Sequence, residues 1–144
     1  MDLLEIGHRI QEAYASSVAE GHAAMGAYTA HDVEIVHVPE VAADGHSSAE
    51  KLEGRAEAEA AALAELKAHL TIETVRQAGD DLLILETALS GTLPDGTDFR
   101  FPEAMLHTFR DGKIVRTVLV GSTEMFSTLA PVMKELGYAS SDWA

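Results

Sequence analysis

Residues 71–120 alternate between strand-like runs and turn signals, and this pattern constrains the fold more than any other feature of the sequence. The turn signals are Gly79-Asp80-Asp81, Pro94-Asp95-Gly96 and Asp111-Gly112, and an Asp-Gly pair is a strong short signature of a two-residue β-hairpin. Strands joined by short turns pair antiparallel, so an antiparallel sheet is expected. The expected strands are residues 71–77, 82–90, 97–110 and 113–120.

Helical periodicity dominates the N-terminal part of the chain. Leu3, Ile6 and Ile10 recur at helical spacing and predict a first helix that ends at Gly21. A second, shorter helix is expected at residues 22–29. After it, the apolar period changes from 3.6 to 2, which predicts a strand at residues 32–38.

The remaining segments are a loop and two further helices. Residues 40–53 contain turn-forming residues and predict an irregular loop, whereas residues 55–70 are rich in alanine and glutamate and favour a helix. A C-terminal helix is expected to start near Thr128, which places Pro131 in its first turn; the alternative is a kinked helix. The order of elements indicates an α+β fold, and the length of 144 residues suits one domain over 1–144.

Composition excludes several classes of function. The chain has 24 acidic and 10 basic residues, a formal charge of −14, which disfavours binding to nucleic acid or to an anionic membrane surface. It has no cysteine, and no pair of its seven histidines has a typical metal-ligand spacing, so neither a metal nor another cofactor is expected. No apolar run reaches the length of a membrane span, and the acidic first residues differ from a secretory signal, so a cytoplasmic location is expected.

Four local motifs, taken in order, resemble a known superfamily. They are residues 27–34 at the entry to the first strand, Gly54-Arg55, residues 90–96, and residues 107–114 with the sequence His-Thr-Phe-Arg-Asp-Gly-Lys-Ile. Together they are similar to the SnoaL-like or nuclear-transport-factor-2-like (NTF2-like) superfamily, which includes polyketide cyclases and ketosteroid isomerases. The resemblance implies a cone-shaped, curved antiparallel sheet wrapped around N-terminal helices, with a pocket in its interior. It does not fix the reaction, because one fold hosts many activities.

Three residues are candidates for catalysis. His107 and Glu103 share one face of a strand, and His37 shares a face with Val33 and Ile35. The resemblance implies that His107 takes the place of an oxyanion-hole aspartate of ketosteroid isomerases, and His37 that of their general base. An imidazole can hold or move a proton near neutral pH, and a carboxylate in an apolar pocket can act as base or acid. The alternative for each is a structural, hydrogen-bonded side chain.

Seven further residues are expected to contact a ligand, on weaker grounds. Tyr14 lies where ketosteroid isomerases keep a catalytic tyrosine, but an aromatic residue at this spacing also suits a core. Glu86 interrupts an apolar strand, and an ion pair with Arg76 is the favoured alternative. The full set is Tyr14, Tyr28, Glu86, Phe101, Met105, Val118 and Ser122.

Ser122 is a departure from the family pattern. SnoaL-like cyclases carry a catalytic aspartate at the corresponding place, and a serine cannot act as a carboxylate base, so their mechanism is not transferred. The leading hypothesis is cofactor-independent proton transfer, of isomerase, cyclase or dehydratase type, on an apolar cyclic or polyketide-like small molecule. The rival hypothesis is a non-catalytic hydrophobic-ligand-binding or dimerising module. Because both faces of the strand at 82–90 look apolar, a homodimer through the outer face of the sheet is expected.

Overall fold

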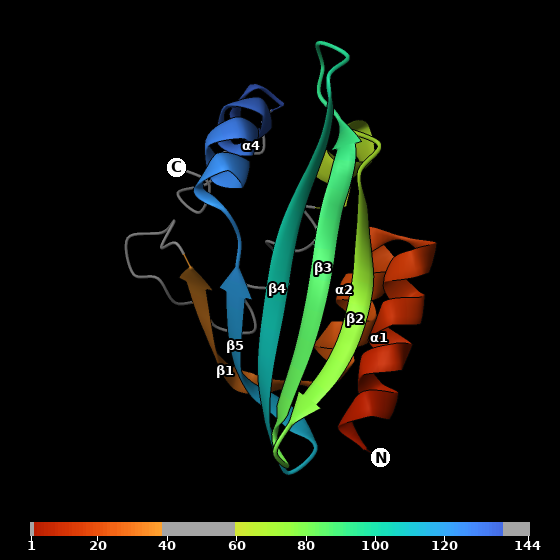
Figure 1. The fold of residues 1–144 in the computed structure, drawn as a ribbon, viewed down its shortest axis with the longest axis vertical. Helices are drawn as coiled ribbons and strands as arrows, with labels where there is room; N and C mark the ends of the chain where they lie inside the picture. Colours follow the sequence, from red (N-terminus) through yellow and green to blue (C-terminus); the bar gives the residue numbers. More distant parts are fainter. Residues whose placement is uncertain (1, 39–59, 137–144) are drawn as a thin grey trace.

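The computed structural model describes residues 2–38 and 60–136 of the chain, which form helices on one side of a curved sheet (Figure 1). Residues 60–65 are helical in addition to the helices named below. The helices are α1 (Leu3–Ser16), α2 (Val18–Ala27) and α4 (Thr123–Glu135). The strands are β1 (Thr29–Val38), β2 (His69–Ala78), β3 (Leu82–Thr92), β4 (Asp98–Arg110) and β5 (Lys113–Val120).

The five strands form one sheet in the order β1-β5-β4-β3-β2. The strands β2, β3, β4 and β5 pair antiparallel, as the turn signals predict. At one edge, β1 pairs with β5 in parallel, which hairpin signals alone do not predict. The sheet is curved and does not close on itself (Figure 1), so the predicted α+β fold is confirmed.

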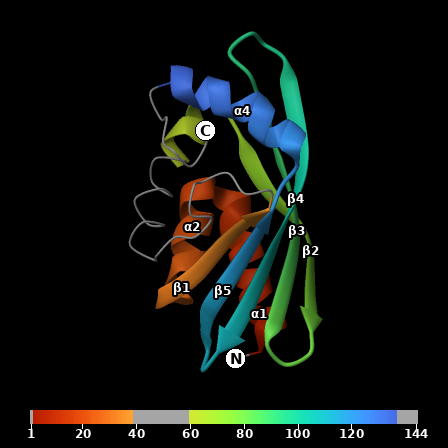
Figure 2. The ribbon, with the colours of Figure 1, turned by 90° about the vertical axis from the view of Figure 1, so that its left-hand side faces the viewer.

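The two faces of the sheet have different surroundings. Figure 2 shows α1 and α2 on one side of the strands, and α4 crosses one end of the sheet on that same side. We call this side the covered face; a side chain added at Gly7 of α1 would collide there with Val75 and Leu83. The opposite side is the open face, over which none of the described helices lies. Because side chains alternate along a strand, Leu83 and Leu85 are fully buried on the covered face while Ile84 is half-buried on the open face.

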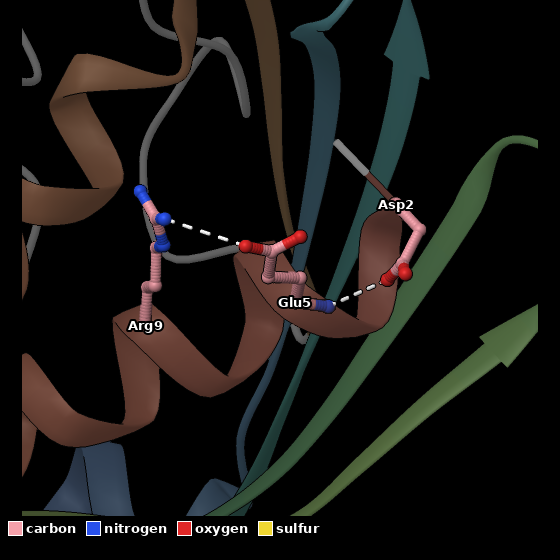
Figure 3. Close-up of polar contacts among 3 residues, drawn as sticks. All are labelled: Asp2, Glu5 and Arg9. Atoms are coloured by element: carbon pink, nitrogen blue, oxygen red, sulfur yellow. Dashed lines mark hydrogen bonds and ion pairs between the residues drawn. The ribbon is translucent and has the colours of Figure 1, made fainter.

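Helix α1 begins with a side-chain cap. The Asp2 carboxylate accepts a hydrogen bond of 2.7 Å from the backbone N–H of Glu5, and Arg9 forms an ion pair of 3.3 Å with Glu5 one turn later (Figure 3). The cap satisfies one of the N–H groups that the first turn of a helix leaves without a partner. None of the described helices is long and apolar enough to cross a membrane.

The boundary between α1 and α2 differs from the prediction. Helix α1 ends at Ser16, and Ser17 has extended backbone and caps α2 by accepting a hydrogen bond from Glu20 N. Gly21 lies inside α2 and does not end a helix. Its role is close packing, because an added Cβ would overlap the ring of Tyr14.

Two other boundaries also differ. Helix α4 starts at Thr123, so Pro131 lies inside the helix and not in its first turn. The described part of the third predicted helix ends before Leu66, where the chain turns with a positive φ of 50° at Lys67. The loop predicted at 40–53 and the first residues of the helix predicted at 55–70 lie outside the described residues.

Candidate functional site

His107 is the most deeply buried polar residue of the covered face. It lies on β4, opposite Leu83 of β3 and Thr117 of β5, and none of its surface is exposed. Its Nδ1 is 2.8 Å from Oγ1 of Thr117, which is itself buried, with 6% of its surface exposed. Its Nε2 is buried and has no hydrogen-bond partner among residues 2–38 and 60–136. A buried polar atom without a partner is costly and is therefore uncommon in folded proteins.

Burial changes the protonation of this imidazole. Desolvation disfavours the charged form and lowers the pKa of His107 from about 6.5 to about 4. At neutral pH the ring is therefore uncharged, with one nitrogen carrying a proton and the other a lone pair. Since a general base works best with a pKa near the working pH, the free His107 is better suited to hydrogen bonding than to removing a proton.

His37 and Glu103 lie on the same face as His107. In the strand register His37 is opposite Leu119, Leu119 is opposite Met105, and Met105 is two residues from His107. The strand β5 separates the two histidines, whose Cα atoms are about 12 Å apart by standard strand spacings. Both His37 and Glu103 are half-buried. The two histidines thus extend from one curved wall, with a strand between them.

Phe101 and Met105 supply the apolar surroundings on the covered face. Both are buried, and the ring of Phe101 stacks on Phe99 at a centroid distance of 5.6 Å. Their neighbours on β3, Leu89 and Leu85, are buried as well. A ligand on this face would therefore meet mostly hydrocarbon, apart from a few polar groups.

The two tyrosines lie at different depths. Tyr14 is buried against Gly21, with its ring edge-on to His22 at 5.7 Å. This position fits the core role that its helical spacing allowed. Tyr28 is half-buried at the end of α2, and its carbonyl oxygen accepts a hydrogen bond from Ile114 N, which ties the helix to the hairpin of β4 and β5.

Glu86 and Val118 are placed away from the covered face, contrary to the expected ligand contacts. Glu86 is exposed and forms an ion pair of 3.1 Å with Arg76, the alternative that the sequence favoured. Val118 is opposite Leu106, one residue out of phase with His107, so it lies on the open face. Strand alternation gives the reason: on β5 the residues opposite His107 and Met105 are Thr117 and Leu119, so Val118 between them faces the other way.

A depression of about 420 Å³ lies at the end of the sheet where α1 begins. Leu3, Ile6 and Phe109 give it an apolar part, and three aspartates, Asp2, Asp80 and Asp111, line its rim. Phe109 is two residues from His107 on the same face of β4, so the depression borders the region of the candidate site. Among the described residues, no group of three histidine or carboxylate side chains could hold a metal ion.

The sequence matches the SnoaL-like domain over residues 10–117, more than half of its length. The chain belongs to the SnoaL-like family. No curated protein matches the sequence.

Solved structures with the same fold agree with this assignment. An NTF2-like protein from Burkholderia thailandensis matches with a TM-score of 0.66 at 22% identity, over 89% of this chain and 96% of that one. A proposed SnoaL-like polyketide cyclase from Jannaschia sp. matches with a TM-score of 0.61 at 14% identity, over 89% of each chain. A protein of ketosteroid-isomerase-like fold from Catenulispora acidiphila matches with a TM-score of 0.58 at 24% identity, over 97% of each chain, in a complex with trimethylamine. At such identities the likeness establishes the fold.

Ser122 has a structural task in this SnoaL-like protein. Its hydroxyl accepts a hydrogen bond of 3.0 Å from Met125 N and caps the first turn of α4. Ser122 stands where the resemblance to SnoaL-like cyclases implies an aspartate, and here it is a helix cap, a role that serine and aspartate perform equally well.

Sequence reasoning missed Thr117, the partner of the buried imidazole. Nothing in the local sequence Arg-Thr-Val-Leu marks this threonine, because threonine is common in strands. The available signal was the register of the hairpin at Asp111-Gly112. A regular hairpin would pair His107 with Arg116, and only the irregularity between Thr108 and Phe109 brings Thr117 opposite His107.

Proposed function

We propose that this SnoaL-like protein is a cytoplasmic small-molecule enzyme that binds an apolar cyclic or polyketide-like compound on the covered face and transfers a proton on it without a cofactor. The reaction would be of isomerase, cyclase or dehydratase type. The observation that carries the proposal is the fully buried His107, whose Nε2 has no hydrogen-bond partner among the described residues, in a wall that is mostly apolar. A ligand oxygen would complete the hydrogen bonding of that atom.

The two histidines take different roles in this proposal. The uncharged His107 donates a hydrogen bond from Nε2 to a carbonyl oxygen while the hydroxyl of Thr117 donates to Nδ1, a pairing that the 2.8 Å contact supports. His37 accepts the proton from the carbon next to that carbonyl, and the electron pair of the C–H bond moves to the oxygen as an enolate forms. Where the enolate is conjugated with a C=C bond of the ligand, return of the proton from His37 to the far carbon of that bond completes an isomerisation. Glu103, on the same face, is the alternative group that could accept the proton in place of His37.

Proton transfer can be tested without knowing the substrate. The ketone 2-tetralone has two fused rings and acidic hydrogens next to its carbonyl, so a protein-catalysed reaction in D2O would incorporate deuterium there. We expect exchange above the buffer rate for the wild-type protein. The loss should be about a hundredfold in His37→Ala, because positioned acid–base groups typically contribute that much or more.

The control is a histidine away from the covered face's interior. His69 on β2 is exposed, so His69→Ala should leave the exchange rate unchanged. His107→Ala should lower the rate while circular dichroism shows a retained fold. Exchange at the buffer rate in the wild-type protein, with a panel of several cyclic ketones, would contradict an enzymatic function.

The second candidate function is non-catalytic binding of a hydrophobic ligand. The pKa of about 4 for His107 and the serine at position 122 favour it, because neither side chain is suited to act as a base near neutral pH. This candidate predicts saturable binding of an apolar ring compound together with no deuterium exchange. Measuring ligand binding and deuterium exchange on the same protein sample therefore distinguishes the two functions.

A homodimer through the open face is also proposed. Val36, Val118, Leu106 and Ile84 lie opposite one another on four adjacent strands and form a half-buried apolar row across this face. A second copy would cover this row. Sedimentation equilibrium should give twice the chain mass, and Leu106→Lys should give the monomer.

A further inference from the structure

The hydrogen bond between His107 and Thr117 affects the orientation of the imidazole and, through it, the kind of ligand group that Nε2 can contact. The two residues are opposite each other on β4 and β5, and both are buried. The contact at Nδ1 orients the ring with Nε2 on its far side. A threonine hydroxyl can donate or accept a hydrogen bond, so it can pair with either neutral form of the imidazole. Nε2 is consequently able to meet either a ligand carbonyl or a ligand hydroxyl.

The charges near this pair limit the ligand further. Every lysine and arginine in residues 2–38 and 60–136 is exposed. Of these, Arg76 and Arg116 are already in ion pairs with Glu86 and Glu34, respectively. A ligand carboxylate or phosphate beside His107 would therefore lie in an apolar environment without a described cation to neutralise it. Burying such an unpaired charge is far more costly than burying a hydroxyl that finds one hydrogen bond.

We propose that Thr117 is a positioning residue that holds His107 as an uncharged hydrogen-bonding group, and that the site consequently selects ring compounds with an uncharged hydroxyl or keto group over the corresponding acids. This inference rests on the proposed binding function but not on catalysis. It assigns His107 the contact with the ligand and Thr117 the control of ring orientation. Neither Phe101 nor Met105 could replace this contact, because their side chains offer no comparable hydrogen-bonding group.

Three ring compounds of the same skeleton test the selection on the full-length protein. They are naphthalene, 2-naphthol and 2-naphthoic acid, measured by fluorescence titration or calorimetry at pH 7.5, where only the acid is charged. The wild-type protein should bind 2-naphthol about tenfold more tightly than naphthalene, the gain of one buried hydrogen bond. It should bind 2-naphthoate more weakly than either.

Two substitutions at position 117 separate positioning from packing. Thr117→Val keeps the shape but removes the hydroxyl, so the preference for 2-naphthol over naphthalene should fall to less than threefold while naphthalene affinity stays the same. Thr117→Ser keeps the hydroxyl and should retain the preference. His107→Phe should remove it. A merely structural threonine would change the affinities of all three compounds together and would leave their ratios unchanged.

The outcomes distinguish this inference from the proposed function. Equal binding of naphthalene and 2-naphthol by the wild-type protein, or tight binding of 2-naphthoate, would overturn the inference while leaving an apolar binding site. Binding of none of the three compounds would overturn it together with the binding function. A preference for 2-naphthol without any deuterium exchange in 2-tetralone would support the inference and contradict the enzyme.

Discussion

Polar side chains have opposite surroundings on the two faces of the sheet. On the covered face, His107 is fully buried and its Nε2 has no hydrogen-bond partner in the described part of the chain. On the open face, Glu86 and Arg76 lie in solvent and pair with each other, with side chains 49% and 64% exposed. His107 and Glu86 both interrupt apolar strand sequence. The burial of His107 costs free energy, whereas the exposed Glu86 incurs no such cost.

This difference is informative about function. An exposed ion pair between neighbouring strands needs no explanation beyond solubility and register, and its contribution to stability is small. A buried imidazole with a free nitrogen reduces stability, so a compensating use such as ligand binding is the reasonable inference. Four experiments test this difference between the faces, from the largest expected effect to the least.

The largest effect should come from truncating neighbours on β3 that face opposite ways. Leu83→Ala should lower the free energy of unfolding by about 3 to 5 kcal/mol, because Leu83 is fully buried on the covered face. Ile84→Ala, on the half-buried open face, should cost about 1 kcal/mol in a monomer. Urea unfolding measures both. A loss for Ile84→Ala that equals that of Leu83→Ala and grows with protein concentration would show that a second copy covers the open face.

The second largest effect should be a pH dependence of the unfolding free energy that the titration of His107 causes. Burial lowers the pKa of His107 to about 4 in the folded state, against about 6.5 in the unfolded state. Between these values only the unfolded chain binds the proton, so the unfolding free energy is complete above pH 6.5 and falls by about 3 kcal/mol as the pH drops to 4.

The control for this prediction is the variant His107→Gln, which cannot titrate. Urea unfolding of both proteins from pH 7.5 to pH 4.5 removes the contribution of the carboxylates, which the two proteins share. The wild-type protein should lose more stability than the variant over this range. Parallel curves would mean that His107 has an ordinary pKa and is reached by solvent.

A smaller effect is expected at Ser122, which caps α4 and stands where the resemblance to SnoaL-like cyclases implies an aspartate. Ser122→Ala removes the cap of α4 and should lower the unfolding free energy by about 1 kcal/mol. Ser122→Asp should keep the cap and restore a carboxylate to this position. Thermal unfolding tests the stability. A destabilised Ser122→Asp protein would show that the position tolerates no charge, and hence that it belongs with the apolar covered face.

The smallest effect should be the coupling between Arg76 and Glu86. A double-mutant cycle with Arg76→Ala and Glu86→Ala should give less than about 1 kcal/mol, because both side chains are substantially exposed. The measured coupling should also fall on adding salt, since exposed charges are screened. A coupling of 2 kcal/mol or more would indicate that the pair is buried in solution, as in a dimer through the open face.

The fold followed from local signals wherever these were strong. Asp111 and Gly112 both adopt positive φ, 53° and 76°, as the hairpin that they predict requires. The break between α1 and α2 was misplaced because Gly21 looked like a helix terminator, whereas its missing side chain makes room for Tyr14. The contact between Gly21 and Tyr14 joins two helices and has no local sequence signature.

The candidate site was predicted only in part. Strand alternation placed His107, Met105 and Phe101 on one face, and the structure has them together on the covered face. The residue Val118 was expected to contact a ligand without a register for β5, and the structure places it opposite Leu106 on the open face. The position of β1 beside β5 came from no local pattern, although it sets the separation between His37 and His107.

The α+β class, the antiparallel hairpins and a histidine on a buried strand face can all be inferred from the residues alone, because alternation and turn chemistry act over a few residues. What that histidine contacts depends on the pairing of β4 with β5. A regular two-residue hairpin would pair His107 with Arg116, but the register shifts between Thr108 and Phe109. The shift turns Arg116 to the open face and brings Thr117 opposite the imidazole, so a hydroxyl and not a cation lies beside it.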